Sequence, residues 1–197
     1  MNLQSIKRDE IDLVATLCAS SFKDDPLFVF FFPNPKERQK KAQVFFKAQL
    51  KMCQSFTFVL EDKSGAIIYQ RPKDKIRPLS IKDGFLLISS SGILSLIKAI
   101  VYQRFSKKIL SDINNKEMDH LVLICVDEKA RNKGLATKMI HDLSSSSTYL
   151  ETQNPNNLTF YKNLGFQLHQ KESFRYCGGS YDHYVLIKDP IRVESSL

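Results

Sequence analysis

The sequence predicts a mixed α/β fold in a single domain, and three patterns support this. The continuous apolar run "DHLVLICV" (119–126), rich in β-branched residues, is typical of a strand buried on both faces of a sheet. Two β-rich runs joined by a polar loop that ends in Gly65 predict a hairpin within 55–72. Apolar residues spaced three and four apart, as in 11–18, predict amphipathic helices between the strands. With 197 residues and 43% hydrophobic side chains, the chain can bury one real core.

The N-terminal half is predicted to begin with a short strand at 3–7, followed by the helix that contains 11–18. Asp25 directly before Pro26 predicts the start of a second helix, which Pro33 stops. A third and longer helix begins near Pro35, because proline is well tolerated in a first turn. Apolar residues that are predicted to lie toward one side of this helix are Val44, Phe45, Ala48 and Met52.

Helices and strands continue to alternate through the C-terminal half. The apolar run at 85–101 is interrupted by Ser89 to Gly92 and by Lys98, and it is shorter than a membrane span of about 20 residues. We therefore expect helices packed on the core within 83–113. The remaining predicted elements are helices at 134–143 and 156–164 and strands at 148–152, 165–171 and 181–189.

The net charge of +8 and the isoelectric point of about 9.3 raise the question of nucleic acid or a membrane surface as a partner. The basic residues are scattered, however, with local clusters only at 36–41 and 71–77. A solvated surface or a general preference for anionic ligands explains such a distribution. We expect no nucleic-acid and no membrane partner; the opposite would appear as steeply salt-dependent binding to duplexes or anionic vesicles.

The four cysteines lie far apart in the sequence and form no C-x-x-C pair, so zinc-ribbon and redox-motif functions have no support. Such cysteines are typical of small, buried or half-buried side chains in a reducing compartment. The N-terminal stretch "MNLQSIKRDEIDL" lacks the apolar segment of a secretory signal. We therefore expect a cytoplasmic protein that holds no metal.

The segment "ARNKGLAT" (130–137) connects the apolar strand to the helix at 134–143 and suits an anionic ligand. A tight turn into a helix leaves backbone N–H groups free at the helix N-terminus, where the helix dipole also favours pyrophosphate. Gly134 allows dihedral angles and a close approach that other residues do not. Small Ala136 avoids a clash, and Arg131, Asn132 and Lys133 supply charge and donors. A lone glycine more often marks a plain turn, and no standard phosphate motif is present.

A second group of polar residues lies in "NNLTFYKNLGF" (156–166). Asn157 and Tyr161 are four positions apart, so on a helix they share one face. A tyrosine hydroxyl at the mouth of a cleft can donate a proton to a departing thiolate. Taken alone, Tyr161 is also compatible with an aromatic residue at the edge of the core.

Together these segments resemble the GCN5-related N-acetyltransferase (GNAT) superfamily. "RNKGLA" (131–136) matches the family's acyl-CoA loop pattern Q/R-x-x-G-x-G/A, and the strand before it looks like the family's fourth strand. "YLET" (149–152) looks like the fifth strand, and 156–166 matches the helix–strand pattern N-x-x-x-Y-x-x-x-G-F. Order and spacing agree with the family across about 119–188.

The resemblance implies a GNAT acyl-CoA N-acyltransferase fold, which has a central, mostly antiparallel twisted sheet of about six or seven strands flanked by helices. It implies extra helices between the third and fourth strands and one domain over 1–197. Within it, 1–118 would shape the acceptor site, with a helical insertion at 83–113, and 119–188 would bind acetyl-CoA. "FKDDPLFVFFFPNP" (22–35) is similar to a subgroup whose aromatic early helices shape the acceptor pocket. Phe28, Phe30, Phe31 and Phe32 are therefore candidates for either pocket or plain core.

The resemblance also implies roles for individual residues. Backbone groups of the strand at Ile124, Cys125 and Val126 would hold the pantetheine arm, and an N–H near Val126 would polarise the thioester carbonyl. Backbone amides would bind the pyrophosphate, and Asn157 would hydrogen-bond the cofactor. Tyr161 would protonate the CoA thiolate. The pyrophosphate-binding amides are those of Arg131, Asn132, Lys133, Gly134, Leu135 and Ala136.

The general base is less clearly indicated by the sequence. An ammonium acceptor loses a proton before it attacks, usually to a carboxylate or a histidine. His120, at the start of the apolar strand, and Glu151, in the next strand, are the candidates. Glu151 is also compatible with a purely structural hydrogen bond.

The resemblance therefore implies an enzyme that transfers the acetyl group of acetyl-CoA to a primary amine by direct attack, without a covalent acyl-enzyme. The acceptor is a small-molecule amine or an amine of a peptide or protein, and the chain is a monomer or a homodimer. The alternative is a catalytically inactive module that binds acyl-CoA as a sensor or regulator. The presence of Tyr161 favours the enzyme, whereas a missing base would favour the module.

Overall fold

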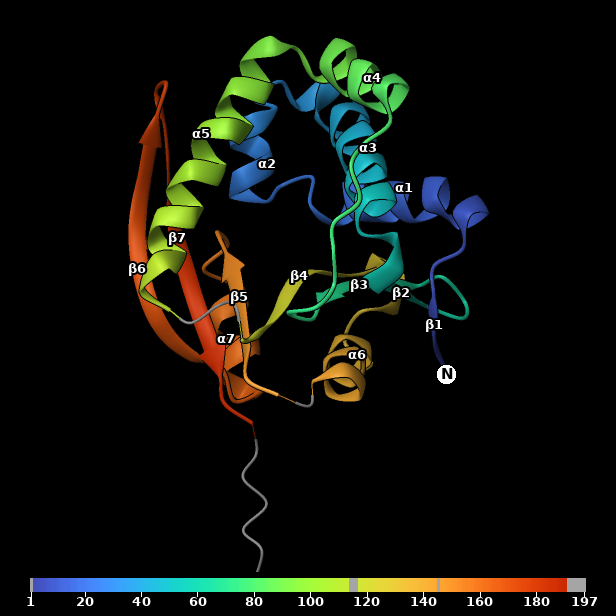
Figure 1. The fold of residues 1–197 in the computed structure, drawn as a ribbon, viewed down its shortest axis with the longest axis vertical. Coiled ribbons are helices and arrows are strands. Elements are labelled where there is room, and N and C mark those ends of the chain that lie inside the picture. Colours follow the sequence, from blue (N-terminus) through green and yellow to red (C-terminus); the bar gives the residue numbers. More distant parts are fainter. Residues whose placement is uncertain (1, 114–116, 145, 191–197) are drawn as a thin grey trace, which may run out of the picture.

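The computed structural model describes residues 2–113, 117–144 and 146–190, and these form a seven-stranded sheet with helices on both faces (Figure 1). The strand order is β1-β2-β3-β4-β5-β7-β6, and every described neighbouring pair is antiparallel except β4 with β5, which is parallel. The mixed, mostly antiparallel sheet predicted from the sequence is confirmed. The strands are β1 (Leu3–Ser5), β2 (Thr57–Leu60), β3 (Gly65–Gln70), β4 (Asp119–Val126), β5 (Thr148–Thr152), β6 (Gln167–Tyr176) and β7 (Gly179–Lys188).

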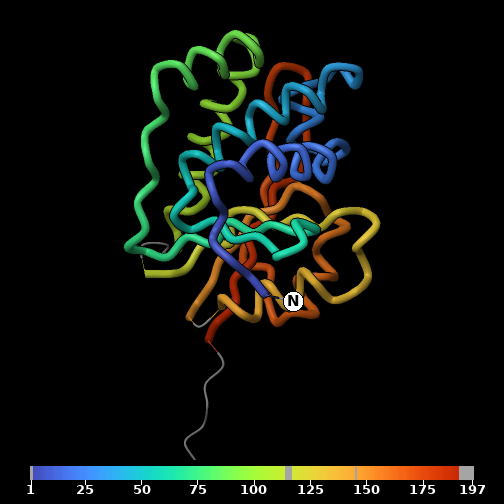
Figure 2. The backbone as a smooth tube through the Cα atoms, turned by 90° about the vertical axis from the view of Figure 1, so that its right-hand side faces the viewer, coloured from blue at the N-terminus to red at the C-terminus, as the bar shows by residue number. Residues whose placement is uncertain are grey.

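The helices form two groups on opposite sides of the sheet, as the two views show (Figures 1 and 2). Helices α1 to α5 lie on one side, and α4 and α5 are the insertion expected between the third and fourth strands. Helices α6 and α7 lie on the other side. Their bounds are α1 (Ile11–Ser21), α2 (Pro26–Phe31), α3 (Pro35–Met52), α4 (Ile81–Ser91), α5 (Ile93–Ile109), α6 (Leu135–Leu143) and α7 (Asn157–Asn163).

The predicted starts of α2 and α3 are confirmed, and both use the same device. The carboxylate of Asp25 accepts a hydrogen bond from the Leu27 N–H at 3.0 Å, with Pro26 in the first helical position. The side-chain oxygen of Asn34 accepts in the same way from the Lys36 N–H at 3.0 Å. A capping side chain satisfies one of the N–H groups that a helix start leaves free, so these residues fix where each helix begins.

The core is divided by the sheet into two apolar layers. Phe46 and Ile68 belong to the layer under α1, α2 and α3, together with Leu123 of β4. Met139 and Ile140 of α6 belong to the layer on the opposite face, together with Leu121. Leu121 and Leu123 are two positions apart in one strand, so they would normally share a face. Their separation shows that β4 is irregular between them.

Two predictions about burial were confirmed only in part. In α3 the fully buried positions are Ala42, Phe46, Ala48 and Leu50, whereas Val44, Phe45 and Met52 are half-buried. The reason is that α3 packs against α1 on one side and α4 on another, so its apolar surface is wider than one stripe. Strand β4 is not buried throughout, because buried residues alternate with the half-buried His120, Val122, Ile124 and Val126.

Strand β4 contains a bulge and then separates from β5. Ile68 of β3 pairs with Leu123 and Tyr69 pairs with Leu121, so Val122 is an extra residue in β4. The described parallel pairing of β4 with β5 ends at Leu121 and Leu150, although both strands continue. Beyond this point the two strands diverge, and the second half of β4 presents an open edge.

Candidate functional site

A cavity of about 1100 Å³ lies where β4 and β5 separate. Five segments form its wall: the α1–α2 connection, the end of β4, the turn into α6, the connection after β5, and α7. The cavity therefore joins parts of the chain that are distant in the sequence. Of the residues expected to bind the cofactor, those on its wall are Ile124, Cys125, Val126, Arg131, Asn132, Gly134, Leu135, Ala136, Asn157 and Tyr161.

The open edge of β4 directs backbone groups toward this cavity. The Asp127 N–H donates to the carbonyl of Ser64, just before β3, at 2.7 Å. In an antiparallel pair, successive residues point their backbone groups alternately to one neighbour and to the other side. Cys125 therefore faces β3, whereas the N–H and C=O groups of Ile124 and Val126 face away from it. The Val126 carbonyl accepts a hydrogen bond from Arg131 Nε at 3.3 Å, as this orientation requires.

The turn into α6 has the geometry of an anion site. Gly134 is the N-cap with φ +71°, a left-handed conformation that favours glycine, and a Cβ placed there would meet no atom within 4 Å. The first backbone bond of the helix runs from the Lys138 N–H to the Gly134 carbonyl. Because Gly134 has no side chain to cap the helix, the first-turn N–H groups remain available to a ligand. Arg131 and Asn132, which precede Gly134, lie on the cavity wall, whereas Lys133 is not among the wall residues as described.

Helix α7 brings Asn157 and Tyr161 to the same wall, one turn apart. The Asn157 side-chain amide donates to Thr152 Oγ1 at 3.3 Å, which ties the start of α7 to the end of β5. Tyr161 is buried in the layer that also contains Phe166. Burial, and then the negative charge of Asp25, raise the pKa of Tyr161 above its usual value, so the hydroxyl keeps its proton.

Asp25, which caps α2, also lies on the cavity wall, and the sequence did not predict this second position. Burial raises the pKa of its carboxyl from 3.8 to about 6, although backbone N–H groups of Leu27 and Phe28 oppose this. Burial is the main cause of the raised pKa of two further tyrosines, Tyr102 and Tyr181, and the charge of Asp25 adds to it. The local sequence correctly predicted that Asp25 caps a helix. No local pattern marks its position opposite α7, because that position depends on the whole fold.

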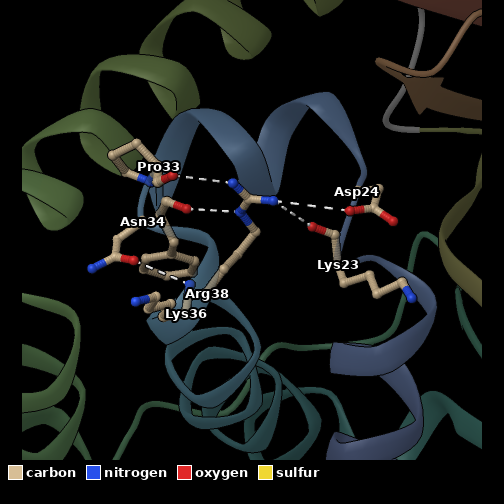
Figure 3. Close-up of polar contacts among 7 residues, drawn as sticks. Lys23, Asp24, Pro33, Asn34, Lys36 and Arg38 are labelled. Atoms are coloured by element: carbon tan, nitrogen blue, oxygen red, sulfur yellow. Dashed lines mark hydrogen bonds and ion pairs between the residues drawn. The ribbon is translucent and has the colours of Figure 1, made fainter.

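Arg38 of α3 holds the loop that carries Asp25, as Figure 3 shows. Its guanidinium donates to the carbonyls of Phe32 at 2.8 Å, Pro33 at 3.1 Å and Lys23 at 3.1 Å. It also lies 3.9 Å from the carboxylate of Asp24. A planar group with several fixed donors is suited to joining three carbonyls. Arg38 thereby fixes both ends of α2 relative to α3.

Glu151 and His120 lie outside the wall of the large cavity as described. Glu151 accepts from Ser106 Oγ at 2.6 Å and pairs with His183 Nε2 at 2.9 Å, while His120 Nε2 is 3.8 Å away. Although burial opposes it, the hydrogen bond from His183 and the nearby histidines lower the pKa of Glu151. Burial lowers the pKa of His120, which lines a separate cavity of about 230 Å³. Their catalytic roles stay predictions.

The remaining candidates have structural environments. Phe28, Phe30, Phe31 and Phe32 are all buried in the layer under α1 to α3, and the cavity wall instead carries Phe22 and Phe160. Cys125 lies on the wall, and its Sγ is 3.5 Å from Sγ of buried Cys18. Cys53 is also buried, whereas Cys177 is exposed, unlike the expectation of burial.

Comparison with known families gives a match in the second half of the chain. Residues 96–179, less than half of the chain, match the family described as acetyltransferase (GNAT) domain. This range contains the open edge of β4, the turn into α6 and all of α7. No curated protein matches the sequence significantly.

Solved structures of similar fold cover nearly the whole chain. An HPA2-related acetyltransferase from Corynebacterium glutamicum is 13% identical, with a TM-score of 0.59 and 96% of each chain covered. The C-terminal condensation domain of Ebony, solved with beta-alanyl-dopamine, is 11% identical, with a TM-score of 0.65 over 95% of this chain and 98% of that one. A putative arylalkylamine N-acetyltransferase 7 from the mosquito Aedes aegypti is 15% identical, with a TM-score of 0.55 over 94% and 86%. At sequence identities this low, the similarity to these structures shows a shared fold and no more.

Proposed function

We propose that the chain is a GNAT N-acetyltransferase that uses acetyl-CoA and acetylates a primary amine by direct attack, and the match of residues 96–179 to the acetyltransferase (GNAT) domain supports this. One observation carries the proposal. A single cavity joins the open edge of β4, the glycine turn into α6, a buried tyrosine hydroxyl and a carboxyl group of raised pKa. These are the groups that binding a CoA thioester and moving two protons require.

Groups on the cavity wall suit the successive parts of acetyl-CoA. The backbone groups of Ile124 can pair with the amides of a pantetheine arm as an added strand would, whereas the Val126 carbonyl already accepts from Arg131 Nε. The N–H groups after Gly134, with Arg131 beside them, suit the pyrophosphate. When bound, acetyl-CoA would supply the activated acetyl group. The Val126 N–H is a donor suited to developing charge on its carbonyl oxygen.

Asp25 is the residue that we assign as general base. A carboxyl with a pKa of about 6 is largely ionised at neutral pH and still basic enough to take a proton from an ammonium group, directly or through water. Its place on the cavity wall supports this role over Glu151 and His120, which lie elsewhere as described. Asp24 beside it adds negative charge that would attract a cationic amine.

Tyr161 is the residue that we assign as general acid. Its raised pKa keeps the hydroxyl protonated, so it can donate to the sulfur of the leaving thiolate. After one turnover Asp25 has gained a proton and Tyr161 has lost one. Both groups open to the same cavity, so solvent can restore the starting state.

The first acceptor class to examine is the arylalkylamines. Three of the similar structures are named as an arylalkylamine N-acetyltransferase, a putative one or one like it. In this chain, half-buried Phe22 and Phe160 stand on the wall together with Asp24 and Asp25. An aromatic surface near carboxylates suits an amine that carries a ring.

The test is release of free thiol from acetyl-CoA in the presence of arylalkylamines, aliphatic amines, amino acids and lysine peptides. Amine-dependent release, with the acetylated product identified by mass spectrometry, is the expected result. Tight binding of acetyl-CoA without release for any amine would instead favour the inactive acyl-CoA-binding module. No binding at all by the folded protein would contradict both functions.

A further inference from the structure

A band of large apolar side chains is exposed on α4 and α5. The exposed fraction is 93% for Ile81, 72% for Phe85 and 74% for Ile93. A monomeric protein exposes single apolar residues commonly, but a contiguous group of this size usually marks an interaction surface. We call this group the apolar elbow, because α4 and α5 meet at a bend of 108°. Its members are Ile81, Phe85, Leu86, Ile88, Ile93, Leu94, Ile97 and Ile100.

Polar contacts on the inner sides of α4 and α5 attach the elbow to α2 and α3. The apolar side chains of the elbow lie on the outer side of these helices. Ser95 Oγ donates to the Phe31 carbonyl at 3.0 Å, and Lys98 Nζ donates to the Phe30 carbonyl at 2.8 Å. On α4, Asp83 pairs with Lys51 of α3. These contacts fix α4 and α5 to α2 and α3, and the apolar residues therefore face outward in the folded chain.

The charge around the elbow is mainly positive. No Asp or Glu occurs from 84 to 111 in the sequence. The exposed stripe of α5 is apolar from Ile93 to Ile100 and continues one turn later with exposed Arg104, Lys107 and Lys108. Exposed Lys82 lies at the start of α4. From 81 to 112, which covers α4, α5 and the turn that follows, there are five basic and two acidic residues, an excess of +3.

The elbow lies at the end of the molecule opposite α6 and α7, as both views show (Figures 1 and 2). The turn into α6, where the cofactor phosphates are proposed to bind, is therefore remote from it. By length and composition no single helix of the described residues could cross a bilayer, and α4 with the segment Ile93–Asp112 forms a bent pair that passes the same test only jointly.

We propose that the apolar elbow docks the protein on the surface of a membrane rich in anionic lipid. Apolar residues flanked by lysine and arginine match both layers of such a surface, the acyl boundary and the negative headgroups. A second copy of this chain is the poorer occupant, because self-pairing would bring two basic stripes together without acidic partners. The proposal is independent of acetyl transfer, and it revises the expectation from the sequence that no membrane is a partner.

The experiment is co-sedimentation of the full chain with two kinds of vesicle. One kind is phosphatidylcholine alone, and the other contains about 30% phosphatidylserine. We expect binding to the anionic vesicles, weakened by raised salt, and much weaker binding to the neutral ones. The double variant Phe85→Ser/Ile93→Ser should lower the partition coefficient roughly tenfold or more, because two large apolar anchors are lost.

The matched control is Leu13→Ser/Leu168→Ser, which removes two exposed apolar side chains, 57% and 43% exposed, outside the elbow. It should bind vesicles as the unchanged chain does. Light scattering of all three proteins measures whether each is a monomer or a dimer. It therefore tests whether a second copy of this chain occupies the elbow instead. The proposal is overturned if the unchanged chain ignores anionic vesicles, if both double variants bind alike, or if the elbow variant converts a dimer to a monomer without loss of vesicle binding.

Discussion

At the scale of single residues, the carboxyl group of Asp25 has two tasks. One oxygen caps α2 by accepting from the Leu27 N–H, and the group as a whole lies on the cavity wall with a pKa of about 6. The capping bond orients the carboxyl, while burial raises its basicity. The sequence predicted the first task from the pair Asp25–Pro26, but the second needs α7, which is remote in the sequence.

Replacing Asp25 with asparagine separates the two tasks, because asparagine is an equally good helix cap but cannot accept the proton. Asp25→Asn should lower turnover roughly a hundredfold or more, with acetyl-CoA affinity nearly unchanged. In the unchanged protein the rate should fall as the pH is lowered through about 6, where Asp25 becomes protonated. Steady-state rates across the pH range measure this, and an Asp25→Asn enzyme with normal turnover would refute the assignment.

We also expect Asp25→Asn to change the stability of the folded protein. Folding raises the pKa of Asp25 from 3.8 to about 6, so the folded state favours the protonated form. This group therefore supports folding fully below 3.8, and its support is lost as the pH rises through 6. Asp25→Asn should raise the melting temperature at about pH 7.5, and the gain should shrink toward pH 4. An unchanged or lower melting temperature at neutral pH would show that Asp25 is not strained by burial.

Tyr161→Phe tests the proton donor. The variant should lower turnover roughly tenfold or more and leave acetyl-CoA affinity within a few-fold, since only the hydroxyl is removed. Tyr176→Phe is the control, because Tyr176 lies on β6 and is not among the residues of the cavity wall. Equal turnover in the two variants would exclude Tyr161 as the acid.

At the scale of elements, the site depends on a strand that leaves its neighbour. The bulge at Val122 and the end of pairing at Leu121 open the edge of β4, and the turn at Gly134 then directs the start of α6 toward the gap. The sequence predicted the strand, the turn and the helix. It could not predict the bulge, because an apolar run such as 119–126 looks the same whether or not one residue is extra.

Gly134→Val tests the turn, and Gly178→Val is its matched control. Both glycines have positive φ, +71° and +75°, and in both cases an added Cβ meets no atom within 4 Å. Both variants should therefore lose similar stability from backbone strain. Only Gly134→Val should bind CoA much more weakly, since Gly178 lies in the β6–β7 turn, away from the cavity wall. Equal CoA affinity in the two folded variants would contradict the phosphate-binding turn.

Arg38→Ala tests the contact between α3 and the loop before α2. Without the three hydrogen bonds to Phe32, Pro33 and Lys23, the loop loosens and Asp25 becomes better solvated. We expect turnover to fall roughly tenfold and the apparent pKa of the rate profile to move from about 6 toward 3.8. Lys41→Ala is the control on the same helix, where only an ion pair with Glu37 is lost. An unshifted pKa would show that Arg38 does not position Asp25.

At the scale of the whole molecule, the two halves of the chain differed in how well the sequence predicted them. Elements with strong local periodicity, such as β5 and α6, were predicted within one residue of their observed bounds. The burial of individual side chains in α3 was predicted less well, because it depends on which helices pack on two sides of α3. The proposal of Asp25 as base depends on the whole fold in the same way, because the sequence does not place Asp25 on the cavity wall, whereas the roles of Glu151 and His120 stay predictions.

The central claim is that the cavity between β4 and β5 binds acetyl-CoA. Calorimetric titration of the purified full chain with acetyl-CoA, and with free CoA, measures this most directly. The account predicts that both bind with a dissociation constant on the order of micromolar, more weakly at high salt because phosphate contacts contribute. A folded protein that binds neither ligand would contradict the assignment of the open β4 edge and the Gly134 turn.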